Sequence, residues 1–326
     1  PAGMMAAGIA AQNSSDVIII ERNERLGRKI LITGKGRCNV TNNCDVISVI
    51  NSIPSNGRFL YSAINQFTPQ DTIGFFESQG VALKTERGNR VFPESDRAKD
   101  IADALEHYIK NQGVKIINDR VKELIVENKK IVGVKTSSGD IINADKVVIA
   151  CGGKSYPKTG STGDGYTLPR RVGHHIIEPK PSLVPLVASQ SWCQELSGLS
   201  LKNVEISVLD KKDNKIVYKD FGEMLFTHFG LSGPIILSAS AHMKDIEKDK
   251  YSVSIDLKPA LTEDQLEKRV MRDFNKNINK DFSNALNDLL PQKLIPIIIN
   301  ISLIPPNTKC NSITKQMRKN FVRTLK

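Results

Sequence analysis

The chain has 326 residues, of which 40% are hydrophobic and 25% are charged. It is longer than one compact core usually holds, so we expect two or three domains, and its apolar content excludes a disordered chain. No run approaches the ~20 apolar residues of a membrane-spanning helix, and the first residues form no signal peptide, so we expect a cytoplasmic protein without a membrane partner.

The formal net charge is +11, and such a surface can bind nucleic acid or an anionic ligand. Because Lys and Arg are spread along the chain and no nucleic-acid-binding motif accompanies them, we interpret them as solvated surface and do not expect a nucleic-acid partner. The five cysteines include no Cys-x-x-Cys pair, and the histidines have no ligand spacing. The sequence therefore predicts neither a disulfide framework nor a metal site.

The first forty residues have the pattern of a dinucleotide-binding fold. A small-residue helix is expected over Pro1–Gln12, and a β-branched strand over Asp16–Glu21. Such folds place a glycine-rich turn before the helix and an acidic residue after the second strand. Gly3 would be the last glycine of that turn, and the Glu21 carboxylate would accept hydrogen bonds from a ribose. The alternative is a buried strand that ends in a surface glutamate.

A polar, glycine-rich segment follows this strand. Gly34 and Gly36 bracket one residue, which lets the backbone approach a planar ligand and point N–H groups at it. Arg28, Lys29 and Arg37 lie in the same segment and can neutralise a pyrophosphate.

The middle of the chain alternates between helical and strand patterns. We expect amphipathic helices near Gln70–Gln79 and Arg97–Asn111, a meander over residues 121–126, 131–136 and 141–143, and a buried strand over Lys146–Ala150 that ends at Gly152-Gly153.

A different composition begins after the prolines at 179–185. Short strands are expected at 204–209, 216–218 and 251–257, and the last part of the chain is expected to be helical. There Thr262 and Gln265 form a capping box, followed by an apolar stripe of Leu266, Val270, Met271 and Phe274. We therefore predict a cofactor domain at 1–187, a β-rich domain at 188–257 and a helical part at 258–326.

Four blocks of the sequence resemble one family. They are ERNERLGRKILITGKGRCNVTN at 21–42, CGGKSYPKTGSTGDGY at 151–166, PSLVPL at 181–186 and FTHFGLSGP at 226–234. All four are similar to the HI0933-like flavoproteins, a family of NAD(P)/FAD-dependent or aminoacetone-oxidase-type enzymes.

The resemblance implies an α/β fold, in which a glutathione-reductase-like, Rossmann-type FAD-binding domain carries an inserted β-rich domain and a helical part. Relative to that family we expect both termini to be truncated, so that the FAD domain begins inside its glycine motif and lacks its C-terminal return. The predicted cofactor-binding residues are Ala2, Gly3, Glu21, Arg22, Arg28, Lys29, Gly34, Gly36, Arg37, Cys38, Asn39, Val121, Ala150, Gly152 and Gly153.

The predicted activity is that of an FAD-dependent oxidoreductase, which transfers a hydride between bound FAD and a small-molecule substrate or NAD(P)H. One alternative is an amine or aminoketone oxidase that uses oxygen as acceptor. Another is a basic RNA- or anion-binding flavoprotein in which FAD is structural.

Two residues are candidates for catalysis. Cys38 stands beside the expected flavin, but it lacks a partner at redox spacing, so we prefer a packing role. His228 lies in a motif-rich loop and is a candidate proton relay that lines the substrate site.

Overall fold

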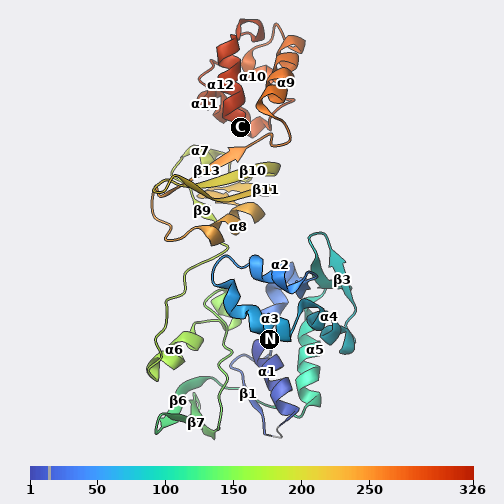
Figure 1. Ribbon diagram of the computed structural model, residues 1–326, viewed down its shortest axis with the longest axis vertical. Helices are drawn as coiled ribbons and strands as arrows, with labels where there is room; N and C mark the ends of the chain where they lie inside the picture. The colour runs from blue at the N-terminus through green and yellow to red at the C-terminus, as the bar shows by residue number, and fades with distance from the viewer. Residues whose placement is uncertain (14–15) are drawn as a thin grey trace. The chain divides into compact units, whose positions relative to one another are not determined.

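A computed structural model of the protein describes residues 1–13 and 16–326 and divides into two compact units (Figure 1). Unit 1 is Pro1–Glu178 and unit 2 is Pro179–Lys326. The three-part division predicted from the sequence, with boundaries at residues 187 and 257, stays a prediction.

Helices form the core of unit 1. Helix α1 (Ala2–Ala11) lies beside α5 (Ala98–Asn111), and α4 (Pro69–Ser78) contributes aromatic rings to the same cluster (Figure 1). Gly8 allows the close approach of α1 to α5, since a Cβ atom at this position would lie 2.1 Å from the ring of Tyr108. That ring also meets Phe75 edge to face at 5.0 Å. Both amphipathic helices predicted in this region, near 70–79 and 97–111, are confirmed.

The parallel ladder of unit 1 joins β1 (Ile18–Ile20) to β5 (Lys115–Ile117). The strand predicted over Lys146–Ala150 is wrong. This segment forms no ladder within the described residues, and the side chains of Val148 and Ile149 are 73% and 37% exposed. Its composition suits a strand, but a strand also needs a neighbour to exchange backbone hydrogen bonds, and none of the described segments supplies one. The segment instead meets α1, where a Cβ on Gly3 would lie 3.2 Å from that of Ala150.

Two small antiparallel sheets complete unit 1. One has the order β2-β4-β3, from Thr41–Asn42, Arg90–Pro93 and Leu83–Glu86. The other is β6-β7-β8, from Val121–Glu127, Lys130–Thr136 and Ile141–Asn143, and it confirms the predicted meander. The remaining helical segments are η1 Ile30–Gly36, α2 Val46–Asn51, η2 Gly57–Leu60, α3 Tyr61–Gln66, η3 Pro157–Thr159 and α6 Asp164–Arg171.

Unit 2 contains a five-stranded antiparallel sheet of order β13-β10-β11-β12-β9. The strands are β9 Leu186–Val187, β10 Ser200–Asp210, β11 Lys215–Thr227, β12 Gly230–Ser232 and β13 Tyr251–Asp256. Their positions confirm the strands predicted at 204–209, 216–218 and 251–257. Helix α8 (Pro234–His242) packs closely on β11, because Gly222 leaves room for Ile235.

The last part of unit 2 is helical. Its segments are α9 Glu263–Lys276, α10 Phe282–Ala285, η4 Gln292–Leu294, α11 Ile295–Ser302, η5 Cys310–Ser312 and α12 Lys315–Leu325. A short helix, α7 Trp192–Glu195, lies between β9 and β10 in the sequence. The capping box predicted at the start of α9 is confirmed, with reciprocal bonds of 3.2 and 2.9 Å between Thr262 and Gln265. Met271 does not belong to the buried stripe: it is 42% exposed, because it follows Val270 by about 100° around the helix. Among the described helices, none has the length and apolar character to cross a membrane.

A side chain at position 8 should destabilise unit 1. Gly8→Val would drive a branched side chain into the Tyr108 ring, which we expect to cost about 1–3 kcal/mol of unfolding free energy. Gly74→Ala is the matched control, because nothing lies within 4 Å of its Cβ position in α4, and it should stabilise by about 0.5–1 kcal/mol. Urea unfolding followed by circular dichroism measures both; equal stability of Gly8→Val and the parent would contradict this packing.

Candidate cofactor site

Glu21 directly follows β1, and hydrogen bonds fix both its backbone and its side chain. Its backbone N–H donates to the carbonyl of Ile117 at 3.0 Å, and its own carbonyl accepts from the Asn118 side chain at 2.9 Å. The Asn23 backbone and side-chain amides donate to Glu21 Oε1 at 2.9 and 2.6 Å. Within the described part of the chain both bonds reach Oε1, which leaves Oε2 to accept a bond from a ligand hydroxyl.

Asp164 ties the next residue, Arg22, to the rest of unit 1. Arg22 Nη1 donates to Asp164 Oδ2 at 3.3 Å and to Thr162 Oγ1 at 3.0 Å. Arg120 clamps the same carboxylate with two bonds of 3.0 and 2.8 Å. Burial opposes ionisation of Asp164, but the hydrogen bonds from Arg120 and Thr162 and the charge of Arg22 outweigh it and hold its pKa below the usual range. Val121, which follows Arg120, is thereby fixed near this network.

Two glycines allow the segment after Ala150 to pack against the residues that follow β1. Gly160 has φ of +103°, and a Cβ there would lie 2.6 Å from the Asn23 amide nitrogen. Gly152 has φ of +72°, and a Cβ there would lie 3.1 Å from the buried Ser161 hydroxyl. Lys29 reaches the same segment and donates to the carbonyl of Ser155 at 2.8 Å. The segment that contains Gly152 and Gly153 therefore lies next to the end of β1.

The loop from Gly34 to Asn39 turns through left-handed backbone conformations. Gly34, Gly36 and Cys38 have φ of +55°, +87° and +61°. A Cβ on Gly34 would lie 2.9 Å from the Asn39 nitrogen, so this tight turn requires glycine. The Asn39 side chain lies 3.0 Å from the Thr41 carbonyl and 3.2 Å from the Val91 carbonyl, and its amide nitrogen can donate to both.

The basic residues predicted to bind pyrophosphate differ in their surroundings. Arg37 forms ion pairs with Glu86 and Asp96, and its guanidinium lies 4.1 Å above the Phe92 ring. Because two carboxylates already balance this charge, a phosphate would have to compete with both. The exposed Arg28 makes one bond of 3.3 Å to the Asn23 side chain and is easier to recruit.

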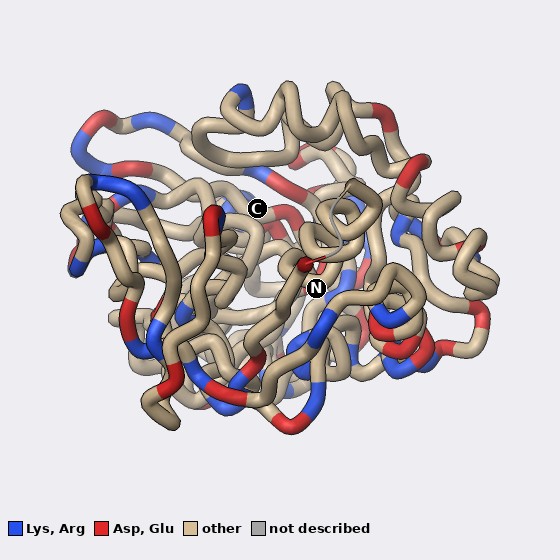
Figure 2. The backbone as a smooth tube through the Cα atoms, turned by 90° about the horizontal axis from the view of Figure 1, so that it is seen from below, with Lys and Arg blue, Asp and Glu red and all other residues tan. Residues whose placement is uncertain are grey.

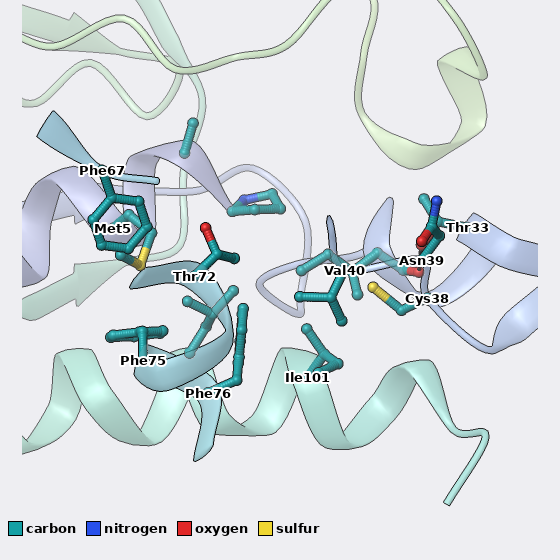
Figure 3. A pocket seen from close by; sticks show the side chains of 14 residues that line it. Met5, Thr33, Cys38, Asn39, Val40, Phe67, Thr72, Phe75, Phe76 and Ile101 are labelled. Atoms are coloured by element: carbon teal, nitrogen blue, oxygen red, sulfur yellow. Dashed lines mark hydrogen bonds between the residues drawn. The ribbon is translucent and has the colours of Figure 1, made fainter. Parts of the chain in front are cut away.

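An apolar pocket of about 290 Å³ opens beside the Gly34–Asn39 loop. Figure 3 shows Thr33, Cys38 and Asn39 at one end of the pocket and Met5, Phe67 and Phe75 at the other. The remaining lining residues are Pro1, Ala2, Ile30, Val40, Thr72, Phe76, Ile101 and Leu105. The volume is at the lower end for small-molecule sites, so the pocket suits a ring system rather than a whole dinucleotide.

Cys38 is buried in the wall of this pocket, with 6% of its surface exposed. Burial raises the pKa of its thiol, although a hydrogen bond with Thr33 acts in the opposite direction. Since the thiolate is the reactive form, this environment suits a packing residue better than a redox thiol.

The structure arranges most of the predicted residues in two groups within unit 1. The group around the end of β1 and the start of α1 consists of Gly3, Glu21, Arg22, Arg28, Lys29, Ala150, Gly152 and Gly153. The group at or beside the pocket consists of Ala2, Gly34, Gly36, Arg37, Cys38 and Asn39. His228 belongs to unit 2, where it is exposed on the turn between β11 and β12 and its ring meets Phe229 at 4.9 Å.

Sequence reasoning did not predict the contacts that hold these groups in place. Asn23, Asn118, Arg120 and Asp164 position Glu21 and Arg22, and Phe67, Phe75 and Phe76 line the pocket. The polar run Asn118-Asp119-Arg120 after a short strand was a usable signal, because the ends of parallel strands meet at one edge of a sheet.

The comparisons with known proteins identify the class. Residues 1–239 match the HI0933-like protein Rossmann domain, and residues 180–326 match the HI0933-like protein barrel and H2TH domain. The chain belongs to the HI0933-like family and is a flavin-dependent oxidoreductase.

Among its relatives, a 3-dehydro-bile acid delta(4,6)-reductase from Clostridium scindens is 31% identical over 99% of this chain and 78% of that protein. Ribosomal RNA dihydrouridine synthases from Escherichia coli and Haemophilus influenzae are 29% and 28% identical. The alignments cover 93% and 98% of this chain, and 72% and 77% of those proteins.

The residues present fit FAD. The Oε2 atom of Glu21 suits a ribose hydroxyl, and Gly3 allows the close packing of α1 on the Ala150 segment that such folds need beside a pyrophosphate. The glycine-rich loop and the apolar pocket suit the flavin ring.

Removing the Glu21 charge should weaken FAD binding. In Glu21→Gln a ribose hydroxyl loses its charged acceptor, which we expect to cost about 1.5–3 kcal/mol, or about 10- to 150-fold in Kd. Glu24→Gln is the control, because Glu24 is exposed on the same loop. Flavin fluorescence titration of the apoprotein measures both variants, and an unchanged Kd for Glu21→Gln would exclude Glu21 as the ribose ligand.

Replacing the Cys38 thiol should leave the chemistry intact. Because this thiol is buried with a raised pKa, Cys38→Ser should retain bound flavin and most of the turnover. Flavin content per polypeptide and steady-state turnover are measured together. Lost turnover at full flavin content would show instead that the thiol reacts.

Proposed function

We propose that the protein is an FAD-dependent reductase that uses NAD(P)H to reduce a carbon–carbon double bond conjugated to a carbonyl group. This proposal rests on a type of reaction that relatives with different substrates have in common. A delta(4,6)-reductase of 3-dehydro bile acids and a dihydrouridine synthase both, by their names, saturate a ring double bond. In each of these rings the double bond is conjugated to a carbonyl group.

Unit 1 supplies binding and orientation for this reaction, and bound FAD supplies the hydride chemistry. Glu21 would hold the ribose, while Arg28 and Lys29 lie near enough to the end of β1 to neutralise phosphate charge. The apolar walls formed by Met5, Phe75 and Phe76 would exclude water from the ring system.

Reduction of a conjugated double bond also requires a proton. Cys38 is a poor donor, because burial raises its pKa and keeps the thiol protonated. His228 is exposed and its imidazole can both donate and accept a hydrogen bond, so it stays our candidate for the proton relay.

An anaerobic half-reaction experiment tests this function. NADPH or NADH should bleach the visible absorbance of the bound flavin, and an α,β-unsaturated ketone added afterwards should restore it. The corresponding saturated ketone is the matched control and should leave the flavin reduced. Bleaching by aminoacetone without bleaching by either nicotinamide would contradict the proposal and favour an amine or aminoketone oxidase.

A further inference from the structure

Positive charge is distributed unevenly within unit 2. Residues 179–257 contain nine Lys and Arg against ten Asp and Glu, whereas residues 258–326 contain thirteen against six. Basic and acidic residues are interspersed along much of the backbone (Figure 2). The excess positive charge of this unit is therefore confined to its helical part.

Helix α12 has a basic face without acidic residues. One side of the helix is buried and consists of Phe321, Val322 and Leu325. The helix contains neither Asp nor Glu. The opposite side carries five exposed residues, Lys315, Gln316, Lys319, Asn320 and Arg323, which we name the α12 face. Its three cations follow at intervals of four residues and span about 12 Å of helix.

These cations differ from those of an ordinary solvated helix. On α9, cations are interleaved with four acidic residues, and Arg269 pairs with Asp273 at 3.4 Å. Among the described residues, no carboxylate forms an ion pair with Lys315, Lys319 or Arg323. Like charges four residues apart destabilise a helix, so a bound polyanion would remove a cost that α12 carries when free.

Against the expectation from the whole sequence that these cations are solvated surface, we propose that the α12 face is a docking surface for RNA. Three cations in a row match a chain of phosphates. In the next row, Gln316 donates to Asn320 at 2.9 Å, and the remaining amide donors and acceptors of this pair can bond to sugars or bases. The face has no apolar residue to insert into a membrane interface. The choice of RNA rests on the proposed function, because uracil carries a ring double bond conjugated to a carbonyl group.

Charge removal at the α12 face tests this surface. The variant Lys315→Gln/Lys319→Gln/Arg323→Gln is compared with Lys211→Gln/Lys212→Gln/Lys215→Gln, which removes three exposed cations from the turn after β10 and the first residue of β11. Fluorescence anisotropy with a labelled, uridine-containing single-stranded RNA gives Kd over a salt series. We expect about tenfold weaker binding and a salt slope lowered by about 2 for the α12 variant, with little change in the control.

Several results would overturn the proposal. One is a parent protein that has no affinity for RNA, and another is an equal loss of RNA affinity in both variants. A third is displacement of RNA by polyglutamate as effectively as by unlabelled RNA, which would indicate an acidic protein partner. A charge-conserving variant, Lys315→Arg/Lys319→Arg/Arg323→Lys, should keep the parent affinity, and a loss there would contradict phosphate contact. Bleaching of the flavin by NADPH is measured in parallel. If the parent protein shows no bleaching, the proposed reductase function is contradicted, whereas the RNA affinities test only the docking surface.

Discussion

The Asp164 carboxylate is the constraint on which the candidate cofactor site depends. It accepts bonds from Arg22 after β1 and from Arg120 before β6, and it stands at the start of α6, so it joins three segments that are far apart in the sequence. The two guanidinium groups outweigh the cost of burying the carboxylate. As a result Arg22 is held in a fixed place directly after Glu21, whose own position is set by Ile117, Asn118 and Asn23.

The site combines two environments that a dinucleotide cofactor requires. Around the end of β1, hydrogen-bonding groups and cations suit a ribose and phosphates, whereas the pocket beside the Gly34–Asn39 loop is lined by aromatic and aliphatic side chains. Ala2 lines the pocket and Gly3 packs on Ala150, so the start of α1 lies next to both environments. A helix N-terminus in such a place favours the negative charge of a pyrophosphate.

Local features of the fold could be predicted from the sequence, and non-local ones could not. The capping box at Thr262 and the turns of the β6–β8 meander depend on residues a few positions apart, and both are confirmed. The Lys146–Ala150 segment has the composition of a strand, but a ladder depends on a partner elsewhere in the chain. The same holds for Arg37, whose pairing with Glu86 and Asp96 joins positions 49 and 59 residues apart. Glycine patterns thus predicted the tight turn of the Gly34–Asn39 loop, whereas the contacts of Asn23, Asn118 and Asp164 needed the structure.

The binding of FAD by unit 1 is tested most directly on the purified protein. Its visible absorbance spectrum is recorded, the protein is denatured and filtered, and the released chromophore is identified by mass spectrometry. The account predicts the bands of an oxidised flavin and release of FAD in about equimolar amount to polypeptide. A colourless protein that also fails to take up added FAD, or one that releases FMN, would contradict it.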